Sequence, residues 1–259
     1  MSAVTMNMLR SVKDLIGYQL KAIDGDIGKC NDFLFDDKQW AVRYLVAKTD
    51  GWLTGRKVVI SPYNLAELNL GAYDVYIPVK LTKQAIEEAP ELEEHAPISR
   101  QYERSLAQHY NHPLYWGQSE MWGAFPHPSL GLPLETPEDL EDEGEAIEAT
   151  HVRSANELLR YGIRATDGEI GNISDFVIEC DTWALRYLVV DTGNWLPGKK
   201  VLISPAWIGN ISWEDKSMAI GMSCEAIKGS PEFDHREPIN RDYEGRLHDY
   251  YGLPRYWGI

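Results

Sequence analysis

The first half of the chain opens with short apolar segments separated by turn residues. Hydrophobic positions gather in the ranges 18–23, 26–35, 40–48 and 57–60. Asp24-Gly25 lies between the first two ranges, and Asp-Gly supplies the positive-φ position that a tight turn needs. Short strands at regular spacing, with turn signals between them, predict a small β-barrel or a sandwich.

Two more strands and then helices are predicted after these segments. The strands are expected at Ala66–Leu70 and Tyr73–Val79. Thr82 is placed to cap a short helix that runs to residue 88, and Ser99 to cap a longer one that runs to residue 110, because a side-chain oxygen at the N-cap accepts from a free backbone N–H. A proline follows each helix. The strands of the barrel thus come first and the helices follow, an order in which strands and helices occupy separate parts of the unit.

The same order of segments occurs twice. Residues 24–62 and 167–205 are identical at 21 of 39 positions, at an offset of 143. Beyond the shared Ser-Pro pair the offset becomes 141, and Tyr115-Trp116-Gly117 then matches Tyr256-Trp257-Gly258. Self-similarity of this kind indicates a duplicated structural unit. We predict a first unit over residues 1–117, an acidic linker with prolines over 118–150, and a second unit over 151–259.

Most of the negative charge lies in the linker. The chain carries a formal net charge of −15, and residues 118–150 hold nine of the acidic side chains and no Lys or Arg. The remaining residues include 31 acidic and 25 basic ones, so no strong basic field is available to hold a nucleic acid. Residues 135–148 are expected to form a solvated tether. Residues 121–134 include Trp122 and Phe125, and are a candidate for an extended segment lying against a barrel.

The cysteines and the N-terminal residues favour a cytoplasmic protein. Cys30, Cys180 and Cys224 form an odd, sparse set, which is typical of reduced thiols. The first 15 residues lack the apolar stretch of a signal peptide. No run of about 18 apolar residues is present, so no integral membrane insertion is expected.

The repeated segments resemble the PRC-barrel family. The resemblance rests on Asp24-Gly25-Asp26-Ile27-Gly28, on Arg43-Tyr44-Leu45-Val46, on Trp52-Leu53 with Gly55, and on Ile60-Ser61-Pro62, each with its counterpart in the second copy. The Tyr-Trp-Gly endings resemble a bacterial group of tandem PRC-barrel proteins. The resemblance implies a chain that is mainly β with α: two small PRC-type β-barrels, each followed by short helices and related by internal duplication.

The same resemblance implies a binding role. The family is named for the cytoplasmic region of the H subunit of photosynthetic reaction centres. It includes the C-terminal domain of a ribosome maturation factor, where the barrel binds a ribosomal protein. This chain differs from the H subunit in having no transmembrane helix. It differs from the maturation factor in having two barrels and not that factor's N-terminal domain, so neither role carries over intact.

Two arginines are candidates for structural ion pairs. In a strand with strict alternation, Arg43 shares a face with small and aliphatic residues, and Arg186 repeats the arrangement. A half-buried guanidinium needs an acid. Asp32 and Asp175, which are also repeated, are the predicted partners; use of the arginines as partner contacts is the alternative.

Repeated aromatic residues are the candidate partner contacts. Trp52 and Trp195 lie in Gly-containing loops, where they either fold back as lids or stand out as contact anchors. Tyr115, Trp116, Tyr256 and Trp257 end the two copies and must dock on their own barrel or on the other one. Duplication suggests that the two barrels pair within the chain.

No catalytic residue, metal site or cofactor is predicted. Nucleotide-binding and hydrolase motifs are missing, and the close pair His109 and His112 lies at the end of a predicted helix. We therefore expect a non-enzymatic scaffold that binds a protein partner. The alternative is a sensor of a small molecule or ion that uses the cleft between the barrels, and an enzyme is a third hypothesis. The sequence does not decide whether the chain forms a homodimer.

Overall fold

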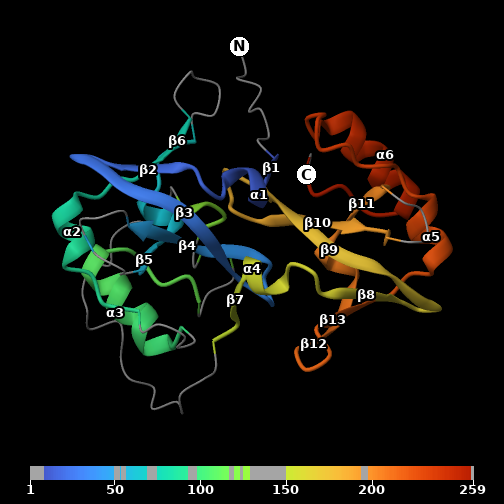
Figure 1. The fold of residues 1–259 in the computed structure, drawn as a ribbon, viewed down its shortest axis with the longest axis horizontal. Helices are drawn as coiled ribbons and strands as arrows, with labels where there is room; N and C mark the ends of the chain where they lie inside the picture. Colours follow the sequence, from blue (N-terminus) through green and yellow to red (C-terminus); the bar gives the residue numbers. More distant parts are fainter. Residues whose placement is uncertain are drawn as a thin grey trace. The chain divides into compact units, whose positions relative to one another are not determined.

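The computed structural model describes residues 9–49, 53, 57–68, 75–92, 98–116, 120–122, 125–128, 150–193 and 198–257. These residues form two compact units, each with its own sheet and helices (Figure 1). The N-repeat unit comprises Asp14–Ala155 and Cys180–Ala184. The C-repeat unit comprises Met1–Lys13, Asn156–Glu179 and Leu185–Ile259.

The N-repeat unit contains a six-stranded sheet. Its strands are β2 (Gln19–Ala22), β3 (Gly25–Asp36), β4 (Ala41–Thr49), β5 (Lys57–Ile60), β6 (Tyr76–Pro78) and β7 (Val152–Ser154). The order is β5-β4-β3-β2-β6, with β7 on β3; the β2–β6 pair is parallel and the other pairs are antiparallel. The helical elements are α1 (Val12–Leu15), η1 (Pro62–Asn64), α2 (Lys83–Glu87) and α3 (Arg100–Tyr110).

The C-repeat unit contains a seven-stranded sheet. Its strands are β1 (Leu9–Ser11), β8 (Gly162–Ala165), β9 (Gly168–Glu179), β10 (Leu185–Asp191), β11 (Lys200–Ile203), β12 (Ile208–Ser212) and β13 (Ser217–Ile220). The order is β11-β10-β9-β8-β13-β12, with β1 on β9. Its helical elements are α4 (Ala155–Leu158), η5 (Pro205–Trp207), α5 (Cys224–Gly229) and α6 (Arg241–Tyr251); Figure 1 draws α5 and α6 in orange to red.

Each sheet includes a short strand that precedes the other repeat in sequence. β1 pairs with β9, and β7 pairs with β3 in the same register. The Ser11 hydroxyl donates to Asp175 and the Ser154 hydroxyl to Asp32, both at 2.5 Å. The compact units therefore differ from the continuous ranges predicted from the repeat, because the strand that completes each sheet comes from before the other copy.

The predicted closed barrels are wrong for the strands that the structure describes, which form two open sheets. β5 forms one edge of the N-repeat sheet, and the chain turns into η1 directly after it. Ser61 caps this turn and Pro62 begins it, and a proline cannot donate to a further ladder. Beyond the named strands, isolated bridges join Leu65 to Val79 and Val201 to Glu232.

The other predicted elements are mostly confirmed. The first four strands are present, as are the helices capped by Thr82 and Ser99, whose hydroxyls accept from backbone N–H groups. Of the predicted strand Ala66–Leu70, residues 66–68 are not strand and the rest lies outside the described residues. Of Tyr73–Val79, β6 is strand. No described helix is both long and apolar enough to cross a membrane.

Gly28 and Gly171 sit at equivalent bends of the long strands. Their φ angles are +146° and +147°. A Cβ at Gly28 would collide with the backbone oxygen of Lys48, and one at Gly171 with that of Asp191. Only glycine accepts both the angle and the close approach. The repeated glycine therefore allows β3 and β9 to bend against their neighbours.

We expect Gly171→Ala to lower the free energy of unfolding by about 2–4 kcal/mol, since it adds both a left-handed strain and a backbone clash. Urea denaturation followed by circular dichroism measures the change. Gly221→Ala is the matched control: its Cβ would meet nothing within 4 Å, and it should shift stability by less than about 0.5 kcal/mol. Equal effects of the two variants would contradict the assignment.

Candidate functional site

Helix α6 has one face toward the core and one toward solvent. Asn240 caps it, with the side-chain oxygen accepting from the Tyr243 N–H at 2.9 Å, and Gly252 ends it at a φ of +67°. Glu244, Leu247 and His248 are buried. The outward residues line a pocket, so the cap that starts the helix also sets the position of the pocket wall.

The inward face is anchored by a buried carboxylate. Glu244 is 1% exposed, and its Oε1 accepts from the hydroxyls of Tyr187 at 2.9 Å and Tyr256 at 2.6 Å. Arg241 Nη1 donates to its Oε2 at 2.9 Å. A buried carboxylate is stable only when paired and hydrogen-bonded. One side chain thus ties together strand β10, helix α6 and the C-terminal segment.

The N-repeat unit contains the same cluster. Glu103 is fully buried and accepts from Tyr44 at 2.9 Å, from Tyr115 at 2.7 Å and from Arg100 at 3.0 Å. Burial raises the pKa of Glu103. Sequence reasoning missed the cluster. The available signal was the repetition of Tyr44 and Glu103 at offsets 143 and 141, because an acid kept in both copies beside apolar helix positions suggests a buried partner.

The aromatic tails dock on their own repeats. Tyr115 is buried beneath Arg43, and Trp116 lies under Arg100 at 4.4 Å. In the C-repeat unit, the Tyr256 and Trp257 rings lie under Arg241 at 5.3 and 4.5 Å. Tyr115 is therefore an internal packing residue rather than an exposed contact. Trp52 and Trp195 lie outside the described residues.

The two arginines pair with different acids from those predicted. Arg43 lies 3.8 Å from Asp36, and Arg186 Nε donates to Glu179 at 3.1 Å. The reason is a β-bulge. Leu34 pairs with Tyr44 while Phe35 pairs with Val42, so Arg43 is the extra residue, and Arg186 occupies the same place in the other sheet. A bulge breaks strict alternation and redirects the side chain. The predicted partners Asp32 and Asp175 accept from Ser154 and Ser11 instead.

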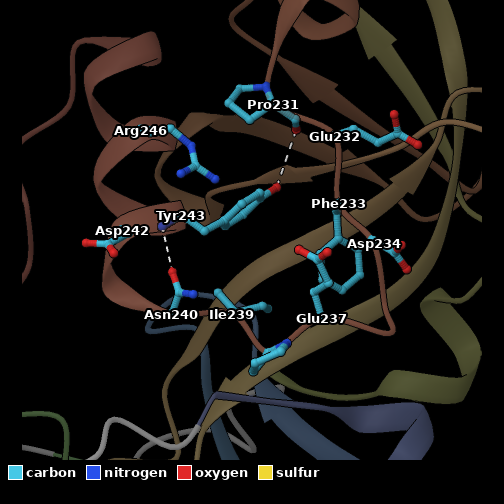
Figure 2. A pocket seen from close by; sticks show the side chains of 11 residues that line it. Pro231, Glu232, Phe233, Asp234, Glu237, Ile239, Asn240, Asp242, Tyr243 and Arg246 are labelled. Carbon is cyan, nitrogen blue, oxygen red and sulfur yellow. Dashed lines mark hydrogen bonds between the residues drawn. The ribbon is translucent and has the colours of Figure 1, made fainter.

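The outward face of α6 forms one side of a pocket of about 620 Å³ (Figure 2). Its lining comes from α6 and from the segment before it: Pro231, Glu232, Phe233, Asp234, Glu237, Pro238, Ile239, Asn240, Asp242, Tyr243 and Arg246. This lining contains no Ser, Thr, Cys, Lys or His, so the pocket has none of the usual nucleophile–base pairs.

The floor of the pocket is apolar and aromatic. The Tyr243 hydroxyl donates to the Pro231 carbonyl at 3.3 Å, and burial raises the pKa of Tyr243, which keeps the phenol neutral. Phe233 and Ile239 belong to the hydrophobic cluster beneath. Figure 2 shows the Arg246 side chain directed toward the Tyr243 ring, with 5.8 Å between guanidinium and ring centre. A ligand in this pocket would find apolar contact area.

The rim of the pocket is acidic. Four carboxylates line it against the single guanidinium of Arg246. Arg236 holds Asp234 through hydrogen bonds of 2.6–3.1 Å and lowers the pKa of that carboxyl. Among the described residues, no ion pair within 4.0 Å involves Glu232 or Asp242, and the Glu237 charge helps to raise the pKa of the nearby Arg236. A negative field over an apolar floor favours a cationic ligand that also has an apolar part.

A second cavity of about 580 Å³ in the same unit carries mixed charges. Arg160, Arg164 and Lys216 line it together with Glu169 and Asp215. Arg164 lies 3.9 Å from Glu169 and 3.7 Å from Asp215, and these three side chains are about half exposed or more. Exposed pairs at such distances contribute little, and the opposing charges give this cavity no clear ligand preference.

The three cysteines and His112 are buried and lie outside the linings of both pockets. The three cysteines are buried free thiols, and burial raises the pKa of Cys30, so its reactive thiolate is disfavoured. His112 stacks on Tyr63 with 5.0 Å between ring centres, and its Nδ1 lies 3.0 Å from the Pro113 carbonyl oxygen. Burial lowers the pKa of His112 to about 4.

Comparison with known protein families gives one match. The profile of the PRC-barrel domain matches residues 151–219, which include β7 to β12 and most of β13. No curated protein matches the chain. The pocket in Figure 2 lies after the matched residues, in the helical part of the C-repeat unit.

We expect Glu244→Gln to lower the free energy of unfolding by about 2–4 kcal/mol, because an amide cannot accept from both phenols and also neutralise Arg241. Chemical denaturation measures the loss. Glu225→Gln, at an exposed position of α5, is the control and should stay within about 0.5 kcal/mol of the parent. Retained stability in Glu244→Gln would show that the cluster does not anchor the helix.

Stability should fall in acid partly through His112. Its pKa is about 4 when folded, against about 6.5 when unfolded, so the unfolded state binds the proton first as pH falls from 6.5 to 4. The resulting loss is about 2 kcal/mol between pH 7 and pH 5. His112→Leu, which copies Leu253 at the equivalent position, should remove this part of the pH dependence. An unchanged slope in a denaturation series from pH 7 to pH 5 would contradict it.

Proposed function

We propose that the chain is a cytoplasmic, non-enzymatic scaffold built from two PRC-barrel units, the second of them the matched region and the first its internal copy. The 21 identities between residues 24–62 and 167–205 support extending the family to the first copy. Known PRC-barrels bind proteins, and this chain takes the same role. It binds a basic segment of a partner protein in the pocket of Figure 2.

The observation that carries the proposal is the acidic rim over an aromatic floor. A Lys or Arg side chain of the partner pairs with Glu237 and Asp242, while a neighbouring apolar residue packs on Phe233 and Tyr243. Charge complementarity sets the approach and the choice of partner, and buried aromatic contact supplies much of the affinity. Tyr243 is well placed for this role because Asn240 and the Pro231 carbonyl fix its position.

The test is binding of a labelled peptide that contains Arg-Leu-Arg-Pro to the full chain, followed by fluorescence anisotropy. Binding should weaken with rising salt and should fall at least about tenfold in the double variant Glu237→Lys with Asp242→Lys, because both rim charges are reversed. Glu225→Lys changes the net charge at an exposed site on α5 and is the control for non-specific attraction.

Two results would overturn the proposal. If Glu225→Lys weakened peptide binding as much as the double variant does, the effect would come from the net charge of the protein and not from the pocket. A small molecule that copurifies with the full chain and is detected by native mass spectrometry, with no peptide binding, would favour the sensor instead.

A further inference from the structure

The linker supplies a bound residue in the N-repeat unit. Trp122 is fully buried there, with 4.9 Å between its ring centre and the Arg43 guanidinium. Arg43 Nη1 donates to the Met121 carbonyl at 2.6 Å. The Trp122 indole N–H donates to the Thr182 carbonyl at 2.8 Å, and Tyr63 packs edge-on against the ring at 5.1 Å. A tryptophan and the carbonyl before it thus fill the site above Arg43.

The equivalent site in the C-repeat unit has the same arginine–tyrosine stack, but its arginine is more exposed. Arg186 lies over Tyr256 at 3.9 Å, as Arg43 lies over Tyr115 at 3.9 Å. The Arg43 side chain is 0% exposed, whereas that of Arg186 is 22% exposed. Among the described residues, Glu179 is the acceptor for Arg186, and it takes the Nε and Nη2 donors, which leaves Nη1 without one.

The side chain at the position equivalent to Tyr63 is also smaller in the C-repeat unit. The position of Tyr63 is taken by Ala206, which is exposed. Tyr63 forms one wall of the Trp122 site, through edge-on ring contact and a hydrogen bond to the Trp122 carbonyl at 3.2 Å, and this wall is absent where alanine takes its place. The C-repeat unit therefore presents a partly exposed arginine stacked on a tyrosine, with a smaller side chain at the position equivalent to Tyr63.

We propose that the surface formed by Arg186 and Tyr256 binds a tryptophan-bearing segment of a partner protein, with the indole against the guanidinium and the preceding carbonyl accepting from Arg186 Nη1. This is the arrangement that Trp122 and Met121 adopt on Arg43. Arginine over an indole is a favourable cation–π contact, and it strengthens when water is excluded. The site is separate from the pocket beside Tyr243 and does not depend on it.

The charges at the site favour this occupant over an anion. Glu179 already neutralises Arg186 through two of its nitrogens, so a carboxylate or phosphate ligand would meet the Glu179 charge as well. An indole and a neutral carbonyl avoid this repulsion and still use the open Nη1 donor. Tryptophan is also among the residues most often found as anchors in protein interfaces.

The probe is a synthetic peptide with the sequence of residues 118–128, in which the tryptophan carries fluorine, titrated with the full chain and followed by ¹⁹F NMR. We expect saturable binding and no binding of the same peptide with alanine in place of tryptophan. Arg186→Gln should weaken binding at least about tenfold. Arg164→Gln, an exposed arginine of the same unit, is the matched control and should leave affinity unchanged.

A second variant separates loss of the site from loss of the fold. Arg186→Lys keeps the charge next to Glu179 but lacks the planar group that stacks on an indole, so it should also weaken binding while the melting temperature stays near that of the parent. The double variant Glu237→Lys with Asp242→Lys should bind the tryptophan peptide with the affinity of the parent. Its substitutions lie in the acidic pocket and leave Arg186 and Tyr256 unchanged.

Three results would overturn the assignment. The first is no binding up to about 1 mM peptide, a limit that corresponds to about 4 kcal/mol of affinity. The second is equal affinity in the parent and in Arg186→Gln, which would mean that the peptide competes with Trp122 at Arg43 instead. The third is a dimer that the peptide dissociates, which would identify the occupant as the linker of a second copy.

Discussion

The arrangement of each unit depends on one buried carboxylate. Glu103 joins Tyr44 of β4, Arg100 of α3 and Tyr115 of the aromatic tail, and Glu244 makes the same three connections in the other unit. Transfer of a carboxylate out of water costs several kcal/mol, so the cluster is stable only when all its donors are in place. This requirement ties the helix to the sheet at a single point. It also fixes which face of α6 turns outward and thereby places Tyr243 at the floor of the pocket.

A second constraint is the origin of the short strand in each sheet. β1 and β7 hold equivalent sequence positions, and each carries a serine that donates to an aspartate on the long strand, at 2.5 Å in both cases. The linker is held at both ends in the N-repeat unit, at Trp122 and at Thr150, whose hydroxyl donates to the Ile98 carbonyl. The two copies are therefore interdependent, since each sheet includes a segment that precedes the other copy. The predicted tether, residues 135–148, lies outside the described residues.

Local features were predictable from the sequence, and long-range pairings were not. The strands around Asp24-Gly25 and the helices capped by Thr82 and Ser99 follow from residues close together in the chain. The acid beside Arg43 was assigned wrongly, because a bulge at that position interrupts alternation and periodicity alone cannot locate a bulge. The Tyr44–Glu103 contact spans 59 residues and has no local signature. Closure into a barrel was inferred from strand spacing and family resemblance, but the described strands form open sheets with β5 and β11 at one edge, and strand spacing does not show whether two edges meet.

The divergence of the two copies indicates where function should be sought. Residues that hold the fold are the same in both: the glutamate, its two tyrosines, its arginine, and the arginine at the bulge. Residues around that bulge differ, with Tyr63 replaced by Ala206 and His112 by Leu253. In the N-repeat unit, Trp122 covers Arg43, so the site above this arginine is occupied by a residue of the chain itself. In the C-repeat unit the equivalent Arg186 is partly exposed, and among the described residues no tryptophan lies against it as Trp122 lies against Arg43. An arginine stacked on Tyr256 in this way suits a surface that receives a segment from another protein.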